Sequence, residues 1–345
     1  MAIARKSLLI GMVLILGGGM KRASAIPQHE KEYFELEIDT AYITDYKKLL
    51  TTRYYLLAQN TRFTLFPEHH ATLEYKPNEA GRIGLAAFYS WFGLGLSIGN
   101  NLFRKDPDIY GTTSSIDFRV NAYGKFIALE TYIQYYQGFY LEYKSDILKE
   151  AFPVPDMKLL SFGLEFTYVY NFSKFSIRAS FIQNERQKKS AGSLIVKPSF
   201  RYYYVEGDTG IVPGEILDIY HIHNTNLHSG HFFSLGLAPG YIYTFVFLKN
   251  FYLTLGGLVE VCWGNYDYET TNFTENSTGY SFPASFRAAL GYNSDTWFIG
   301  ASYISTPFYI KPGERVQNDF HYKLNQYRFW VGTRFDAFKK RNKKK

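Results

Sequence analysis

Apolar residues alternate with small or polar residues at nearly every position between Phe251 and Trp263. The apolar face ends in an aromatic residue at both ends, and the opposite face carries a single charge, Glu260. A period of two is the signature of a β-strand whose two faces meet different surroundings. About 9–11 residues is also the length that a tilted strand needs to cross a bilayer. We therefore predict a membrane-spanning strand here.

The same alternation recurs along the chain and predicts a barrel. An even number of strands is expected for such a barrel, and the stretches that we count number thirteen. A weak strand near 216–221 makes fourteen, whereas treating 191–228 as an insert in the lumen makes twelve; we favour fourteen. The class is all-β, a transmembrane antiparallel up-and-down β-barrel of about 12–14 strands. The remaining predicted strands are 53–65, 83–90, 92–99, 116–122, 127–134, 160–170, 175–181, 191–205, 231–247, 286–292, 297–303 and 327–335.

The connections between these strands alternate in length, which fits a barrel with turns on one side and loops on the other. Short turns are predicted at 91–92, 123–125, 171–173, 249–250 and 293–295, and a tight connection at 187–193. Long polar loops are predicted at 101–112, 138–157, 266–279 and 306–321.

The two ends of the chain differ from its body. Residues 1–25 combine Arg5 and Lys6, an apolar run and Ala23-Ser24-Ala25, which predicts a secretory signal peptide. We assign 26–50 to a periplasmic lead-in, 51–336 to the barrel and 337–345 to a basic tail. The formal charge of +7 comes mostly from the two ends, so the body offers no surface for nucleic acid.

Composition favours the membrane over a secreted β-sandwich, although both alternate. Aromatic residues make up 19% of the chain, an excess that interfacial aromatic belts would explain. The more polar face of the strands is dominated by Gly, Ala, Ser and Tyr with about one charge per strand, which suits a confined lumen. The single cysteine, Cys262, excludes an intramolecular disulfide; it is expected to face inward as an inert thiol.

A family resemblance rests on the segments 42–46 (YITDY), 73–78 (LEYKPN), the Gly-rich pair at 84–99, 174–179 (KFSIRA) with 187–193 (QKKSAGS), and 238–245 (APGYIYTF). They resemble the domain of unknown function 4421 family, predicted outer-membrane proteins of Bacteroidetes. The resemblance covers roughly 33–335 and implies an outer-membrane location, but no known activity, so it assigns no functional residue. The basic tail departs from the usual ending of a barrel.

Charged residues predicted to face the lumen are the main candidates for a functional site. They could ring a pore and set its ion selectivity, or pair with one another and fill a small lumen. The sequence leaves both alternatives open. The residues are Asp117, Arg119, Glu130, Glu165, Arg178, Glu260, Arg287, Arg328 and Arg334.

Four histidines, His221, His223, His228 and His231, lie within one short stretch. Imidazoles at such spacing could bind zinc or copper, although a solvated loop is the simpler interpretation. Ser229 beside two of them is the nearest approach to a nucleophile and base, and no G-x-S-x-G motif is present.

From these features we expect an outer-membrane barrel, not an enzyme, without a cofactor. It would act as a narrow passive channel for ions or small solutes, or as a structural protein. The alternative is a surface-binding protein with a plugged lumen, and a lower-ranked one is a lipid-modifying enzyme that uses the histidine stretch. The expected partners are outer-membrane lipid, the barrel-assembly machinery and periplasmic chaperones.

Overall fold

The computed structural model describes residues 37–66, 72–79, 81–99, 104–143, 151–208, 210–220, 226–310 and 319–337. The predicted signal peptide, residues 26–36 of the lead-in, and 338–345 of the tail lie outside these residues, as do His221 and His223. None of the helices among the described residues is long and apolar enough to cross a membrane.

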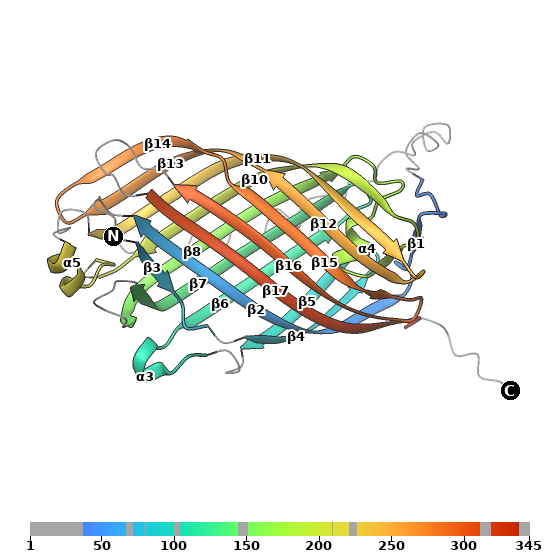
Figure 1. Ribbon diagram of the computed structural model, residues 1–345, viewed down its shortest axis with the longest axis horizontal. Coiled ribbons are helices and arrows are strands. Elements are labelled where there is room, and N and C mark those ends of the chain that lie inside the picture. Colours follow the sequence, from blue (N-terminus) through green and yellow to red (C-terminus); the bar gives the residue numbers. More distant parts are fainter. Residues whose placement is uncertain are drawn as a thin grey trace, which may run out of the picture. The chain divides into compact units, whose positions relative to one another are not determined.

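Twelve antiparallel strands form a closed ring (Figure 1). The last strand pairs with the first along its whole length, from Asp319↔Phe66 to Phe335↔Leu50, and this pairing closes the ring. Ten of the twelve are β2 (Leu50–Phe66), β4 (Arg82–Tyr89), β5 (Phe92–Gly99), β6 (Ser114–Tyr123), β7 (Ile127–Tyr143), β8 (Ala151–Val169), β10 (Ala191–Glu206), β11 (Leu227–Phe247), β16 (Trp297–Ile310) and β17 (Asp319–Phe335).

The other two strands are each interrupted once. The first consists of β12 (Phe251–Val259) and β13 (Val261–Thr270), which pair with β11 in the same register on both sides of the break. The second consists of β14 (Thr274–Ser281) and β15 (Ala284–Asn293), which pair in one register with β13 and β12, respectively. The break lies where Glu260 meets Pro283: the Glu260 N–H donates to the Pro283 carbonyl at 2.9 Å. Because proline has no N–H, the return bond of the ladder cannot form there.

The predicted all-β barrel of about 12–14 strands is confirmed, with twelve strands in the ring that the described residues form. The preference for fourteen within that range is wrong. Residues 175–181, predicted as a strand, instead form the short helix α4 (Ile177–Phe181). Its start is capped by Ser176, whose hydroxyl accepts from the Ala179 N–H at 3.0 Å. The weak strand proposed near 216–221 lies on another helix, α5 (Gly214–Tyr220). Short alternating runs do not distinguish a strand from one turn of helix followed by a bend.

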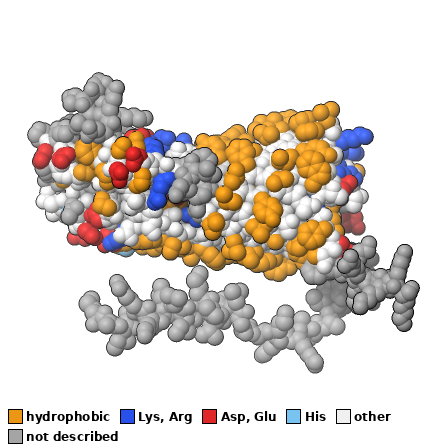
Figure 2. Space-filling view, turned by 90° about the horizontal axis from the view of Figure 1, so that it is seen from below, with side chains coloured by type: hydrophobic (Ala, Val, Ile, Leu, Met, Phe, Trp, Pro, Cys, Tyr) orange, Lys and Arg blue, Asp and Glu red, His pale blue; other side chains and the backbone are white. Residues whose placement is uncertain are grey.

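An exposed apolar belt surrounds one half of the barrel, and Figure 2 shows it as a band of hydrophobic side chains on the face in view. We call the end of the barrel nearer to this belt, which carries the turns at 90–91, 124–126, 248–250 and 294–296, the short-turn end. Aromatic residues border the belt at both edges, as in membrane-spanning barrels. Members of the belt include Leu85, Leu96, Phe118, Phe166, Leu194, Leu237, Val259, Leu290, Ile299 and Phe329, with Trp91, Phe247, Phe251 and Trp297 at one edge and Trp263, Tyr280 and Tyr327 at the other.

The strands continue well beyond the belt, toward what we call the long-strand end. β11 has 21 residues, or roughly 70 Å at about 3.3 Å per residue, whereas such a belt is about 25 Å tall. Within the predicted loops at 138–157, 266–279 and 306–321, nearly all the described residues belong to strands, which corrects these loop bounds. Residues 144–150 and 311–318 lie outside the described part of the chain. In 101–112, the described part contains α3 (Pro107–Tyr110). These stretches were predicted as loops because they are polar. The outer face of a strand that extends beyond the membrane meets water, so it is polar as well.

Tightly packed apolar side chains fill the interior of the long-strand end. A further strand, β3 (Leu73–Lys76), bridges β2 and β7 beyond the ends of the short strands β4 and β5. The core includes Phe63, Tyr75, Tyr136, Phe139, Tyr203, Phe232, Tyr266, Tyr268, Phe308, Phe320 and Tyr322, all at most 4% exposed.

Candidate functional site: the barrel interior

The connection between β8 and β10 folds back into the barrel at the short-turn end. Residues 171–190 contain α4 and the short strand β9 (Glu185–Gln187), which pairs with β1 (Ile43–Asp45) from the predicted lead-in. Figure 1 shows α4 and β1 at the end of the barrel where β17 finishes. We call residues 171–190 the plug. The predicted turn at 171–173 and residues 187–190 of the predicted connection at 187–193 are therefore parts of one longer inserted segment, whereas 191–193 begin β10.

Hydrogen bonds hold the plug to strands around the ring. The Ser180 hydroxyl lies 2.6 Å from the Thr254 hydroxyl and 3.3 Å from that of Thr244. From β2, Arg53 Nη1 donates to the Phe181 carbonyl at 2.7 Å. Asn293 Nδ2 donates to the carbonyls of Ala179 and Glu185 at 3.2 and 3.1 Å. Strands β2, β11, β12 and β15 thus all contact the same short segment.

Two of the predicted lumen residues, Arg178 and Arg334, belong to this plug assembly. Arg178 is not on the barrel wall, which corrects its prediction as a strand residue: it lies in α4, and its Nη1 is 3.1 Å from Glu185 Oε1. Arg334 is on β17, and its Nε donates to the Gln183 carbonyl at 2.7 Å. Gln183 adopts a φ of 66°, a left-handed conformation that is costly outside glycine and is maintained here by its bonds.

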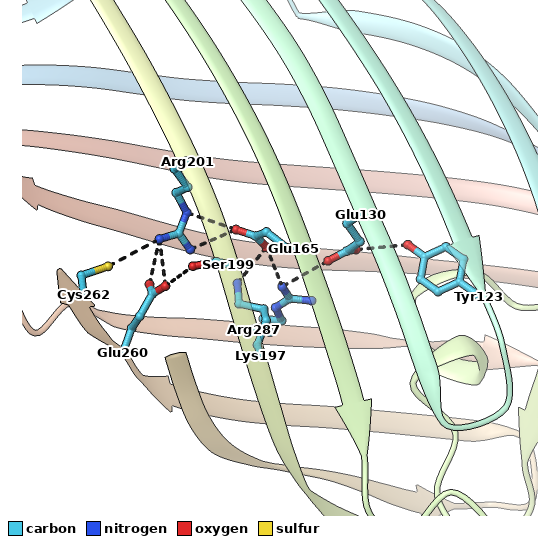
Figure 3. A network of polar contacts seen from close by, with 9 residues as sticks. All are labelled: Tyr123, Glu130, Glu165, Lys197, Ser199, Arg201, Glu260, Cys262 and Arg287. Atoms are coloured by element: carbon cyan, nitrogen blue, oxygen red, sulfur yellow. Dashed lines mark hydrogen bonds and ion pairs between the residues drawn. The ribbon is translucent and has the colours of Figure 1, made fainter. Parts of the chain in front are cut away.

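A charged network crosses the middle of the barrel (Figure 3). Arg201 is fully buried at its centre and bonds two carboxylates. Its Nη1 donates to both oxygens of Glu260 at 2.9 Å, and its Nη2 donates to Glu165 Oε1 at 3.0 Å. The Ser199 hydroxyl donates to Glu260 Oε1 at 2.5 Å. Each charge is thereby paired, as buried ions require.

The network continues from Glu165 to further strands. Lys197 Nζ donates to Glu165 Oε2 at 2.8 Å, and Arg287 Nη2 lies 3.9 Å from the same oxygen. Arg287 also bonds Glu130 Oε2 at 3.4 Å, and the Tyr123 hydroxyl donates to Glu130 Oε1 at 3.1 Å. A separate pair, Arg119 Nε with Asp117 Oδ1 at 2.9 Å, lies on β6.

The structure therefore brings four of the nine predicted lumen residues, Glu130, Glu165, Glu260 and Arg287, into one network. They pair with one another and with two residues that the sequence analysis did not name, Lys197 and Arg201. The alternation of residues along β10 could have identified both as inward-facing. Because the exposed Leu194 and Val196 fix the outward positions of β10, every odd-numbered position from 191 to 205 must face inward.

Arg328 differs from the other predicted lumen residues. It faces inward, since its neighbours Tyr327 and Phe329 are 43% and 58% exposed on the lipid side. Within the described residues it makes no ion pair, and its recorded contact is with the Tyr55 ring at 5.6 Å.

A cavity of about 110 Å³ lies between the plug and the charged wall. Ile177, Phe181 and Ile182 of the plug segment line one side of it, and Tyr203 and Tyr322 of the apolar core line it as well. Its charged lining residues are Arg53, Arg119, Glu130, Glu165, Arg287 and Arg328.

The described part of the histidine stretch faces outward. His231 Nδ1 lies 2.8 Å from the Tyr202 hydroxyl, and its ring stacks on Tyr204. His228 Nε2 lies 3.2 Å from the Thr271 hydroxyl. Both rings thus have partners other than Ser229. Across the described residues, no three histidine, cysteine or carboxylate side chains gather closely enough to hold a metal ion.

The family model described as Domain of unknown function (DUF4421) matches residues 37–335. The chain belongs to this family. The resemblance noted from the sequence is thereby confirmed, and the family description assigns no activity to this DUF4421 chain. No curated protein matches it in sequence.

Solved structures similar to this DUF4421 chain include the translocator domain of the autotransporter NalP from Neisseria meningitidis. It has 13% identity and a TM-score of 0.35 over 86% of this chain and 90% of its own. The outer membrane protease OmpT from Escherichia coli has 9% identity and a TM-score of 0.31 over 83% of this chain and 95% of its own. At these identities and TM-scores, no residue role can be carried over from either structure to this chain.

Proposed function

We propose that the protein resides in the bacterial outer membrane as a closed β-barrel and acts through its projecting long-strand end, as a structural or surface-binding protein. The apolar belt with aromatic edges supports a lipid setting, with outer-membrane lipid and the barrel-assembly machinery as partners. The observation that carries the proposal is the plug, which is hydrogen-bonded inside the lumen to β2, β11, β12, β15 and β17.

The sequence ranks a narrow passive channel or a structural protein first, and the interior supports the structural protein or the plugged, surface-binding alternative over the channel. Three layers follow one another along the barrel: the plug, the paired charges and the apolar core of the long-strand end. A conducting path needs polar groups that remain open to water. Here most of the charges bind one another, and the aromatic layer leaves little room for hydrated ions.

Single-channel recording tests the closed state. Purified protein, shown to be folded by its heat-modifiable migration, is inserted into planar bilayers beside a known porin as the assay control. We expect no discrete conductance steps, and no change with Glu260→Gln. Regular steps from the wild-type protein, with an ion selectivity that Glu260→Gln alters, would restore the channel interpretation.

Cysteine labelling tests which end faces the outside. In a Cys262→Ser background, Asp267→Cys places a thiol on the exposed face of β13, and Lys249→Cys places one in a turn at the short-turn end. A membrane-impermeant maleimide applied to intact cells should label the first variant alone. Labelling of the second variant alone would reverse the orientation and remove the projecting end as a surface for external partners.

A further inference from the structure

The cavity beside the plug carries more positive than negative charge. Among its lining residues, four are arginines and two are glutamates. Both glutamates already bind cations: Glu165 pairs with Lys197 and Arg201, and Glu130 with Arg287. Arg119 is neutralised by Asp117. Two lining cations, Arg53 and Arg328, form no ion pair with a carboxylate among the described residues.

Arg53 is held in place but not neutralised. Its Nη1 donates to the Phe181 carbonyl and, at 3.3 Å, to Gln183 Oε1, and its guanidinium lies 4.9 Å from the centre of the Phe88 ring. Only 5% of Arg53 is exposed, and its Nε is buried without a hydrogen-bond partner among the described residues. The two neutral oxygens and the Phe88 ring therefore contact part of the Arg53 guanidinium, but they supply no negative charge.

Arg328 is less satisfied still. Its Nε is also buried without a partner, and its terminal nitrogens form no hydrogen bond or ion pair with the described residues. Since it faces inward and lines the cavity, those nitrogens can meet a ligand there. Arg53 and Arg328 lie on the paired strands β2 and β17, so two like charges share one enclosed space.

An enclosed pair of uncompensated cations is unstable unless something neutralises it. Burying an ion costs several kcal/mol even after relaxation, and a second like charge nearby adds to that cost. A guanidinium presents a planar fork of donors that matches a carboxylate, phosphate or sulfate group. The cavity of about 110 Å³ has room for a small group of this kind.

We propose that this cavity binds a small oxyanion, held by Arg53 and Arg328 and enclosed by α4 of the plug. Bound there, the anion links β2 and β17, the strands that close the ring, to the segment that plugs it. The inference is independent of the compartment in which the protein resides and of any partner at its surface.

Thermal unfolding of the detergent-solubilised protein tests the site. The transition temperature is followed while sodium phosphate, sulfate or acetate replaces sodium chloride at constant ionic strength. We expect phosphate or sulfate to raise it along a saturating curve that is complete at low millimolar concentration. General exclusion of sulfate from protein surfaces instead increases steadily with concentration, so the shape of the curve distinguishes the two effects.

Two variants locate the binding. Arg328→Gln should weaken the apparent affinity about tenfold or more, because a charged contact is removed. It should also unfold at a higher temperature than the wild-type protein in chloride alone, because one of the two like charges is gone. Arg62→Gln, on the same strand as Arg53 but paired with Glu74 at 3.2 Å outside the cavity, should retain the full response.

Two results would contradict the proposed oxyanion site. If oxyanions stabilise the wild-type protein no more than chloride does, the cavity holds water only and the proposal is wrong. An unchanged response in Arg328→Gln would place any bound anion elsewhere. Should Arg328→Gln fail to fold, the wild-type titration and Arg328→Lys, which keeps the charge but loses the fork, still decide between these outcomes.

Discussion

Arg201 on β10 and Glu260 on the β12–β13 strand bond each other across the intervening strand β11. They meet because the residue between them on β11 is Gly236. A Cβ atom at Gly236 would collide with Glu260 Oε1 and would lie 2.6 Å from Ser199 Oγ. The missing side chain lets one ion pair join three adjacent strands.

Gly236→Ala should therefore destabilise the barrel by about 1–3 kcal/mol, the usual range for overpacking. Gly257→Ala is the matched control, because a Cβ there meets nothing within 4 Å, and it should be neutral. Urea unfolding in lipid vesicles, monitored by tryptophan fluorescence, measures both. Equal midpoints for the two variants would mean that Glu260 can move aside without loss.

Arg201→Met should be among the most disruptive single substitutions in the interior. It leaves Glu260 buried without an ion pair, and breaking a buried pair in this way costs about 3–5 kcal/mol. The double variant with Glu260→Met should recover most of that loss. Lys158→Met, which removes a cation from exposed ion pairs near the long-strand end, serves as the control and should have no measurable effect. A double variant no more stable than Arg201→Met would contradict the pairing argument.

Glu79, which follows β3, should make stability depend on pH. Burial raises the pKa of its carboxyl from 4.5 to about 7, and Tyr136 and Arg82 offset only part of this shift. Because the folded protein binds the proton more tightly, the stabilisation is complete below about pH 4.5 and is lost as pH rises through 7. Its full size is at most ~3 kcal/mol.

The comparison of Glu79→Gln with the wild-type protein at pH 5 and pH 8 measures this effect. The variant should gain stability relative to the wild-type protein as pH rises. Glu269→Gln, an exposed position on β13, should show no such trend. A constant difference between Glu79→Gln and the wild-type protein would show that Glu79 titrates normally.

Leu96→Arg tests the lipid face directly. Leu96 is 72% exposed within the apolar belt. An arginine on the lipid face near the bilayer midplane costs about 2–4 kcal/mol. Thr278→Arg on β14, exposed beyond the belt, should be tolerated. Unfolding in vesicles gives both values, and a tolerated Leu96→Arg would mean that water rather than hydrocarbon meets this face.

The ring of strands could be predicted because each strand has one apolar face and one more polar face, and the alternation of its own residues reveals both. Leu253 and Leu255 alternate with Tyr252 and Thr254, and no distant residue is needed to recognise that pattern. The same signal misassigned 175–181, since Phe175 and Ile177 alternate with Ser176 and Arg178 just as a strand would. This segment differs from the true strands because Ser176 caps a helix there and because its hydrogen-bond partners lie inside the barrel.

By itself, the sequence determined the all-β class, the lipid-facing positions and the inward direction of most of the charges, because these follow from a local period of two. Only the tertiary structure decided that the charges pair, that residues 171–190 fold into the lumen, and that the described residues form a ring of twelve strands. Those properties depend on contacts such as Arg334 with Gln183, between residues about 150 positions apart, which no local pattern encodes.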